Sequence, residues 1–230
     1  MANEENKRTI RSFVRRAGRM TASQQKALAE LWPVYGVEFT GTELDFEAMF
    51  GRVAPLVLEI GFGNGDSLVR LAAHDPSADF LGIEVHDPGI GHCMIAARGA
   101  NVQNLRLIAH DAIEVLENGI PPTSLQRINL YFPDPWPKKR HHKRRIVQPA
   151  FLEMCSAKLK SGASLHIATD WANYAEHIDE VLADSALFDC AERREHSGDA
   201  PLSRSATKFE RRGLRKGHRI WDWRFQKIDL

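Results

Sequence analysis

The stretch Leu56-Val57-Leu58-Glu59-Ile60-Gly61-Phe62-Gly63-Asn64-Gly65-Asp66 decides the fold of this chain. Its five mostly apolar residues predict a buried strand, and the three glycines after them predict a tight turn into a helix that begins at Asp66. Glycines at such a turn let a ligand approach the backbone closely. The stretch therefore predicts the first strand and helix of an α/β sheet, with a ligand site where that strand ends.

The glycine spacing restricts the kind of ligand. Gly61, Gly63 and Gly65 are two residues apart, whereas the dinucleotide fingerprint G-x-G-x-x-G directs a helix N-terminus at a pyrophosphate. Asp66 follows at once and would repel a phosphate there. We expect a ligand that has no phosphate and carries a cationic amino-acid end. A nicotinamide-dependent oxidoreductase is disfavoured.

From Pro55 onward, short apolar runs alternate with helical stretches, which is typical of βαβ units. The predicted strands are 56–60, 80–85, 105–108, 126–131 and 164–169, and the predicted helices are 66–73, 88–98, 112–117, 144–159 and 171–183. Two weaker β candidates, 187–192 and 218–225, would close the sheet as an antiparallel pair. The fold class is therefore α/β, with a mostly parallel, doubly wound sheet and an antiparallel C-terminal edge pair.

Upstream of this domain, which we place at residues 51–230, residues 1–50 are predicted to be a basic, partly flexible N-terminal arm with a short helix. Arg8, Arg11, Arg15, Arg16 and Arg19 have few apolar neighbours. Both an arm that contacts RNA and a solvated tail explain this pattern. The helix is expected over 25–31, with an N-cap in 21–24 and a stop at Trp32-Pro33.

Acidic residues recur where successive strands end. Glu59 lies in the first strand, Glu84 ends the second, Asp111 follows the third and Asp134 follows the fourth. Any one of them is equally well explained as a helix cap or a surface carboxylate. Strand ends line one crevice in a doubly wound sheet, so we expect the four to converge. Glu84 suits the ribose hydroxyls and Asp111 an adenine amino group, and the set suits S-adenosylmethionine.

A proline-rich turn, Phe132-Pro133-Asp134-Pro135-Trp136-Pro137, follows the fourth strand. Its prolines fix φ and present Asp134 and Trp136 with little backbone freedom. Six cations and two histidines fill the next eight residues, Lys138–Arg145. The net charge is only +1, so this local concentration predicts a basic face for a nucleic acid or another polyanion. His141 and His142 are adjacent and diverge on a helix, so no metal site is expected.

Composition excludes several classes. Cys93, Cys155 and Cys190 form no CxxC pair, so neither a disulfide framework nor a zinc site is predicted, and core thiols are expected. No apolar run approaches the roughly 18 residues of a membrane span, and Met1–Asn6 is too polar for a signal peptide. A soluble, cytoplasmic protein is expected, and nothing in the sequence indicates an oligomeric state.

Four motifs resemble one family closely, the bacterial tRNA (guanine-N7-)-methyltransferases, and the likeness spans nearly the whole chain. They are Gly82-Ile83-Glu84-Val85-His86, Phe132-Pro133-Asp134-Pro135-Trp136, Ala168-Thr169-Asp170-Trp171 and Thr207-Lys208-Phe209-Glu210-Arg211-Arg212-Gly213. The resemblance implies a Rossmann-like class I methyltransferase that transfers a methyl group from S-adenosylmethionine to N7 of a guanine in the tRNA variable loop. Asn64, Asp87 and Ser205 depart from the family's pattern.

The resemblance also implies residue roles. Glu59, Glu84, Asp111 and Asp134 bind the methyl donor beside Gly61, Gly63 and Gly65, and Asp134 is the active-site residue. The residues implied in binding the tRNA substrate are Lys138, Asp170, Thr207, Lys208, Phe209 and Glu210. Those implied in contacting RNA are Arg140, His141, His142, Lys143, Arg144 and Arg145.

The chemistry of N7 agrees with these roles. N7 carries an in-plane lone pair and no proton, so alignment and charge stabilisation matter more than a general base. Asp134 is the first candidate for accepting hydrogen bonds from guanine N–H groups, and Asp170 is the second. Trp136 either stacks on the substrate or packs in the turn. The alternative is a non-catalytic RNA-binding protein on the same scaffold, and the basic run disfavours a small-molecule or protein methyltransferase.

Overall fold

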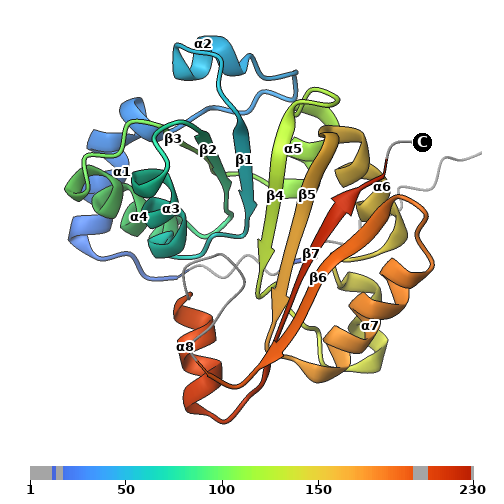
Figure 1. Ribbon diagram of the computed structural model, residues 1–230. Helices are drawn as coiled ribbons and strands as arrows, with labels where there is room; N and C mark the ends of the chain where they lie inside the picture. Colours follow the sequence, from blue (N-terminus) through green and yellow to red (C-terminus); the bar gives the residue numbers. More distant parts are fainter. Residues whose placement is uncertain (1–11, 14–17, 199–206, 229–230) are drawn as a thin grey trace, which may run out of the picture.

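Seven strands form one sheet in the computed structural model, which describes residues 12–13, 18–198 and 207–228 (Figure 1). The strands are β1 (Leu56–Ile60), β2 (Asp79–Ile83), β3 (Leu105–Ile108), β4 (Leu125–Tyr131), β5 (Leu159–Thr169), β6 (Phe188–His196) and β7 (Ile220–Lys227). Their order is β3-β2-β1-β4-β5-β7-β6. β1 to β5 are parallel, and β7 runs antiparallel to both β5 and β6. The predicted fold class is confirmed.

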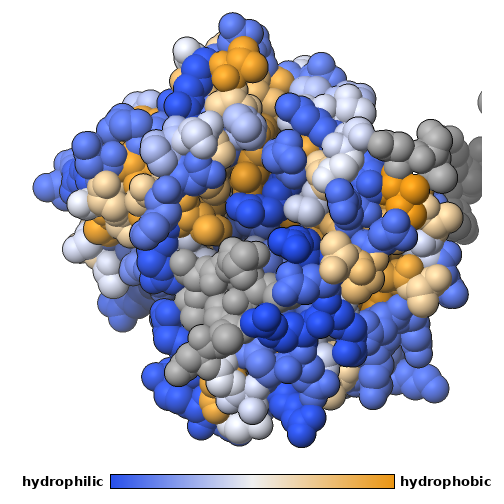
Figure 2. Space-filling model, in the orientation of Figure 1, coloured by the Kyte–Doolittle hydropathy of each residue, from blue (hydrophilic) through white to orange (hydrophobic). Residues whose placement is uncertain are grey.

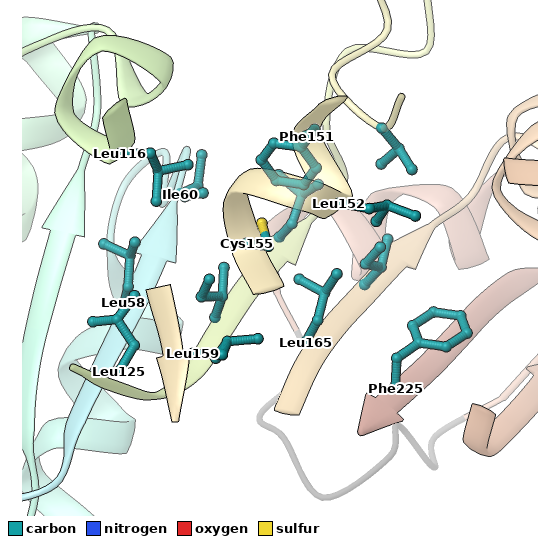
Figure 3. Packing of buried hydrophobic residues seen from close by; sticks show 14 of the residues in the cluster. Leu58, Ile60, Leu116, Leu125, Phe151, Leu152, Cys155, Leu159, Leu165 and Phe225 are labelled. Atoms are coloured by element: carbon teal, nitrogen blue, oxygen red, sulfur yellow. The ribbon is translucent and has the colours of Figure 1, made fainter. Parts of the chain in front are cut away.

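Helices cover both faces of the sheet. One core cluster joins the sheet to α1 (Ala22–Tyr35), α3 (Asp66–His74) and α4 (Asp87–Gly99). The other joins it to α5 (Ala112–Asn118), α6 (Pro149–Lys158) and α7 (Ala172–Ala183). Figure 3 shows part of this second cluster, in which Phe151, Leu152 and Cys155 of α6 pack on Leu159 and Leu165 of β5. Alternate residues of the central strands thus face opposite helical layers, as a doubly wound sheet requires.

The first helix is longer than predicted. Thr21 caps α1 through a capping box with Gln24, as its position suggested, but the helix continues past Pro33 to Tyr35. Pro33 lies in the last turn and cannot donate the helical hydrogen bond to Ala29 O, so other contacts must hold this turn. Tyr35 is buried and its hydroxyl donates to Val102 O at 3.1 Å. This packing holds the final turn on the core, and a short helix, α2 (Phe46–Phe50), follows before β1.

The predicted helix over 144–159 is wrong in its first third. A 3-10 turn, η1 (Lys139–Arg144), is followed by extended backbone, and α6 begins only at Pro149. Proline is favoured in the first helical turn because its fixed φ suits a helix that needs no N–H there. β5 also begins earlier than predicted, at Leu159 directly after α6.

The last helix, α8 (Lys208–Arg215), lies beyond the end of the sheet at which the parallel strands terminate (Figure 1). Within the described ranges, no helix is long and apolar enough to cross a bilayer. Cys93 and Cys155 are core thiols as expected, but Cys190 is exposed on β6.

Candidate active site at the ends of the parallel strands

A cavity of about 380 Å³ opens where β1, β2, β3 and β4 end. Its walls include Gly61, Gly63, Glu84, Asp111 and Asp134. The volume lies within the usual range of small-ligand sites, about 300–1,000 Å³. Three of the four predicted carboxylates therefore meet in one cavity.

The glycine loop forms one wall. Gly61, Gly63 and Gly65 all have positive φ, at +69°, +60° and +77°. Side chains other than glycine's rarely adopt this left-handed conformation, so the spacing of the three glycines follows from the path of the backbone. A Cβ on Gly65 would also lie 2.3 Å from Cys93 Sγ. The loop thus presents backbone to the cavity instead of side chains.

Glu84 ties this loop to the end of β2. Its Oε2 accepts from Gly63 N at 2.8 Å, while its Oε1 accepts from Val85 N at 2.7 Å and His86 N at 3.1 Å. Burial raises the pKa of Glu84, and the three N–H donors oppose that rise only in part. These three hydrogen bonds thus fix the orientation of the Glu84 carboxylate at the C-terminal end of β2.

Asp111 serves two purposes. Its Oδ1 accepts from Ile113 N at 3.0 Å and caps α5, and the residue also lines the cavity. The helix-cap interpretation is therefore confirmed, and the role of Asp111 in binding the donor stays a prediction.

A second cavity of about 170 Å³ adjoins the first and contains Glu59 in its wall. Gly61, Tyr131, Phe132 and Phe209 line both cavities. Glu59 is 2% exposed and lies on β1 just before the glycine loop. The fourth carboxylate thus lies behind the loop, in the smaller cavity.

The turn after β4 is built around two residues in the left-handed region, Phe132 (φ +54°) and Trp136 (φ +46°). Each precedes a proline, a position at which the right-handed helical conformation is disfavoured. Trp136 Nε1 donates to Ser12 O at 2.9 Å, and the Arg144 guanidinium lies 4.0 Å from the centroid of its ring. Trp136 is therefore held by contacts with Ser12 and Arg144, as the packing interpretation expects.

The basic run divides into exposed and buried members. Lys138, Arg140 and Lys143 are exposed, but Arg145 is only 3% exposed. The Arg145 guanidinium donates to Pro135 O at 3.0 Å and to Asn173 Oδ1 at 2.7 Å, and lies 4.9 Å from the centroid of the Tyr174 ring. The expectation that Arg145 contacts RNA does not fit this burial, because the residue braces the Asp134 turn.

His141 and His142 are partly buried in η1. His142 Nε2 lies 3.2 Å from an Arg145 nitrogen, and the His141 ring contacts Trp136 edge-on at 5.8 Å between centroids. Among the described residues, no cluster of His, Cys, Asp or Glu with the geometry of a metal site occurs.

The predicted substrate segment 207–210 begins α8. Thr207 is the N-cap, its Oγ1 accepts from Glu210 N at 3.0 Å, and Glu210 Oε2 accepts from Thr207 N at 3.2 Å. Glu210 is fully buried, so it caps the helix and does not face solvent. Lys208 and Phe209 are exposed and line the smaller cavity.

Asp170, after β5, faces the other end of α8. Its Oδ2 lies 3.1 Å from His218 Nδ1, and a Cβ on Gly213 would lie 2.8 Å from the same oxygen. The structure therefore groups Asp170 with α8, and it is not in the wall of either cavity. Figure 2 shows that the surface over α8 and beside it is mostly hydrophilic.

Two residues that the sequence did not single out complete the larger cavity. Ser12 and Phe13 line it, and their carbonyl oxygens accept from Trp136 Nε1 and Arg144 respectively. No local pattern predicts this contact, because it joins residues more than 120 positions apart. Arg8, Arg11, Arg15 and Arg16 of the predicted basic arm lie outside the described residues.

A protein-family model described as "Putative methyltransferase" matches residues 53–223. The chain is 54% identical over 220 residues to the tRNA (guanine-N(7)-)-methyltransferase of Yersinia enterocolitica, covering 96% of this chain and 92% of that protein. It is 53% identical over 229 residues to the protein of the same name from Aeromonas hydrophila, with 99% and 97% covered. Both relatives therefore match along nearly their whole length.

Solved structures agree on the fold at low identity. An antibiotic-related methyltransferase matches with a TM-score of 0.59 at 14% identity, over 84% of this chain and 96% of that one. The 16S rRNA methyltransferase KamB matches with a TM-score of 0.56 at 16% identity, over 80% and 93%. A 16S rRNA (adenine(1408)-N(1))-methyltransferase from Catenulisporales acidiphilia, solved with its cosubstrate, matches with a TM-score of 0.53 at 16% identity, over 82% and 93%. These likenesses support a class I methyltransferase fold.

Proposed function

This chain belongs to the family of bacterial tRNA (guanine-N7-)-methyltransferases, and from that premise we propose how its residues carry out the reaction. The enzyme transfers a methyl group from S-adenosylmethionine to N7 of a guanine in tRNA. The family membership favours this activity over a non-catalytic RNA-binding role.

The larger cavity suits the methyl donor. Glu84 is held by three backbone N–H groups with its carboxylate at the end of β2, where it accepts from the ribose hydroxyls. Asp111 lies at the end of β3 and accepts from the adenine amino group. Glu59, with the Gly61–Gly65 loop in front of it, supplies negative charge toward the cationic amino-acid end.

Asp134 is the residue to which we assign the catalytic role. It is exposed at the rim of the donor cavity and lies on the turn that leads directly to Lys138 and Arg140. A side chain placed there faces the donor on one side and bound RNA on the other. This position between the cavity and the cations is the observation on which the proposal depends.

When bound, S-adenosylmethionine supplies an electrophilic methyl group on a positively charged sulfur. N7 already has an available lone pair, so no residue has to remove a proton before attack. Asp134 accepts from guanine N–H groups, which fixes the direction of N7, and its charge stabilises the cation that develops on the purine. Arg145 keeps the Asp134 turn in place through Pro135 O.

Exposed Lys138, Arg140 and Lys143 neutralise RNA phosphates and set the register of the substrate. N7 lies on the major-groove edge, which side chains do not read in A-form RNA. The target guanine is therefore unstacked, as in the variable loop. The enzyme works in the cytoplasm, where tRNA is processed. In this scheme Asp170, beside α8, holds the substrate, and α8 contributes Lys208.

The test is incubation with labelled S-adenosylmethionine and unmodified tRNA, followed by mapping of the methylated atom. We expect 7-methylguanine at one variable-loop position. Label at a ring nitrogen other than N7, or at a base outside the variable loop, contradicts the proposed target.

Asp134→Ala tests the catalytic assignment. We expect methyl transfer to fall at least about 100-fold, because alignment and charge stabilisation are lost together. tRNA affinity should change by less than about threefold, because the cations that contact phosphates remain. Asp189→Ala, on exposed β6, is the matched control and should keep wild-type turnover. Near-wild-type turnover of Asp134→Ala would falsify the assignment.

A further inference from the structure

One face of the sheet carries a row of buried polar side chains. Register aligns Glu59 with Asn129, and Asn129 with His166. Farther along, Asp222 pairs with Ala168 of β5 and with Arg194 of β6. Neighbours in register point to the same face, so Glu59, Asn129, His166 and Asp222 share one side. All four are buried, on a face whose central strands otherwise need apolar residues.

The middle of the row leads to the wall of the donor cavity. His166 Nδ1 lies 3.1 Å from the Tyr131 hydroxyl, and the two rings meet edge-to-face at 5.1 Å between centroids. On the other side, His166 Nε2 lies 3.3 Å from Asp222 Oδ1. Tyr131 lines both cavities and immediately precedes the Asp134 turn. Asp222 is therefore connected to the strand end that presents the catalytic position.

The far end of the row reaches α8. Asp222 Oδ2 lies 3.3 Å from His196 Nε2, and the same nitrogen lies 4.0 Å from Glu210 Oε1. His196 Nδ1 lies 2.8 Å from Gly198 O. His196 is thus placed between two fully buried carboxylates, one on β7 and one on the first turn of α8.

The first turn of α8 is part of the donor site. Phe209 lines both cavities, and a Cβ on Gly63 would lie 3.5 Å from its ring. Phe209 therefore lies against the glycine loop, although it is 55% exposed and has little packing of its own. Its place depends on how the helix start is held, and Glu210 holds that start through the capping box.

We propose that His196 and Asp222 are positioning residues for methyl-donor binding, because they fix the first turn of α8 so that Phe209 covers the glycine loop. The inference depends on the proposed placement of the donor in these cavities. His196 links the buried carboxylates of Asp222 and Glu210, and such groups are stable in a low-dielectric interior only when they are paired. Without this link, Glu210 loses its connection to Asp222 on β7, and the start of α8 shifts away from the glycine loop.

A merely structural role for His196 predicts lower stability with unchanged kinetics. The positioning role predicts a separation of kinetic constants, since in this proposal Phe209 covers the glycine loop that holds the donor, whereas Asp134 holds the target base. In His196→Gln, KM for S-adenosylmethionine and Kd for S-adenosylhomocysteine should rise about 3- to 10-fold, with kcat within about twofold of wild type. His74 is exposed in the last turn of α3, where its Nδ1 lies 2.9 Å from Arg70 O, so His74→Gln is the control and should change neither constant.

A double-mutant cycle with Phe209→Ala completes the test. If His196 acts by placing Phe209, His196→Gln should add less than about twofold to the Kd of the Phe209→Ala enzyme. Full additivity, or unchanged donor constants in a folded His196→Gln enzyme, overturns the proposal. If His196→Gln does not fold, the isosteric Asp222→Asn carries the same measurement. Wild-type enzyme that fails to bind S-adenosylhomocysteine would instead contradict the proposed donor site.

Discussion

Arg145 shows how a cation within a basic run can have a structural task. It is buried against Tyr174 and donates to Pro135 O and Asn173, so its charge is directed inward. In Arg145→Lys a single ammonium group replaces the planar guanidinium, and it cannot donate to Pro135 O and Asn173 in the same geometry. We expect kcat to fall at least about 10-fold through misplacement of Asp134, with tRNA affinity nearly unchanged.

The matched control is Lys143→Gln, because Lys143 is exposed in the same run. It should weaken tRNA binding and leave kcat at saturating tRNA unchanged. Steady-state kinetics and a filter-binding titration separate the two variants. If Arg145→Lys mainly weakens tRNA binding, as Lys143→Gln does, the structural role of Arg145 is contradicted and Arg145 is an RNA contact.

Glu84 predicts a pH dependence of donor binding. The pKa of Glu84 is raised, chiefly because burial disfavours the charged form. Only the carboxylate accepts from both ribose hydroxyls, so affinity is full above this raised pKa and is lost as the pH falls through it. The loss should therefore begin at a higher pH than for an ordinary glutamate.

Titration calorimetry with S-adenosylhomocysteine, from about pH 8 down to about pH 5, measures this dependence. Glu84→Gln should bind weakly with a flatter profile, and Asp111→Asn should keep the acid-side loss. A Glu84→Gln enzyme with the wild-type profile would assign the titration to another group.

At the scale of the element, the position of α8 depends on one missing side chain. A Cβ on Gly213 would lie 2.8 Å from Asp170 Oδ2, closer than real Cβ contacts permit. Gly213→Ala should therefore move α8 or Asp170 and reduce methyl transfer, although alanine favours a helix by about 1 kcal/mol. Gly99→Ala is the control, because nothing lies within 4 Å of a Cβ there. It should raise the melting temperature slightly and leave turnover unchanged.

Elements were predictable where the local pattern was strong. The strands over 56–60 and 105–108 match the structure because short, continuous apolar runs between turn residues have few alternatives. The helix over 144–159 was predicted to begin too early, although Pro149 is a local signal for a first helical turn. Arg145 also makes a tertiary contact with Asn173 O, which the sequence does not reveal. For α8, the pattern Thr207-x-x-Glu210 is a capping-box signature and was a usable signal for the helix start.

At the scale of the whole molecule, uneven charge predicts salt-sensitive tRNA binding. Each phosphate contact contributes about 0.7 to 0.9 to the slope of log K against log salt. Replacing Lys138, Arg140 and Lys143 together by glutamine should reduce that slope by about two to three. Lys26→Gln with Lys160→Gln changes exposed cations elsewhere and should leave it unchanged. Salt-independent affinity of the wild-type enzyme would contradict a phosphate-binding surface.

Some residues of the candidate site were predictable from the sequence, and others depend on contacts between distant parts of the chain. Glu84, Asp111 and Asp134 were predictable because a parallel sheet brings successive strand ends to one edge. Ser12 and Phe13 were not, since their place depends on a distant indole and guanidinium. His166 is a buried residue of β5 whose Nδ1 lies 3.1 Å from the Tyr131 hydroxyl. Its link through Asp222 to α8 needed the order of β5, β7 and β6.

That strand order has a consequence for synthesis of the protein. β7 follows β6 in the chain but is inserted between β5 and β6. A nascent chain that stops before Ile220 holds two strands that have no common neighbour, and each exposes an edge with unpaired N–H and C=O groups. Such edges invite aggregation and attack by proteases. The strand that closes the sheet also carries Asp222, so β6 cannot join the sheet, and His196 cannot meet Asp222, until Ile220–Lys227 has been synthesised.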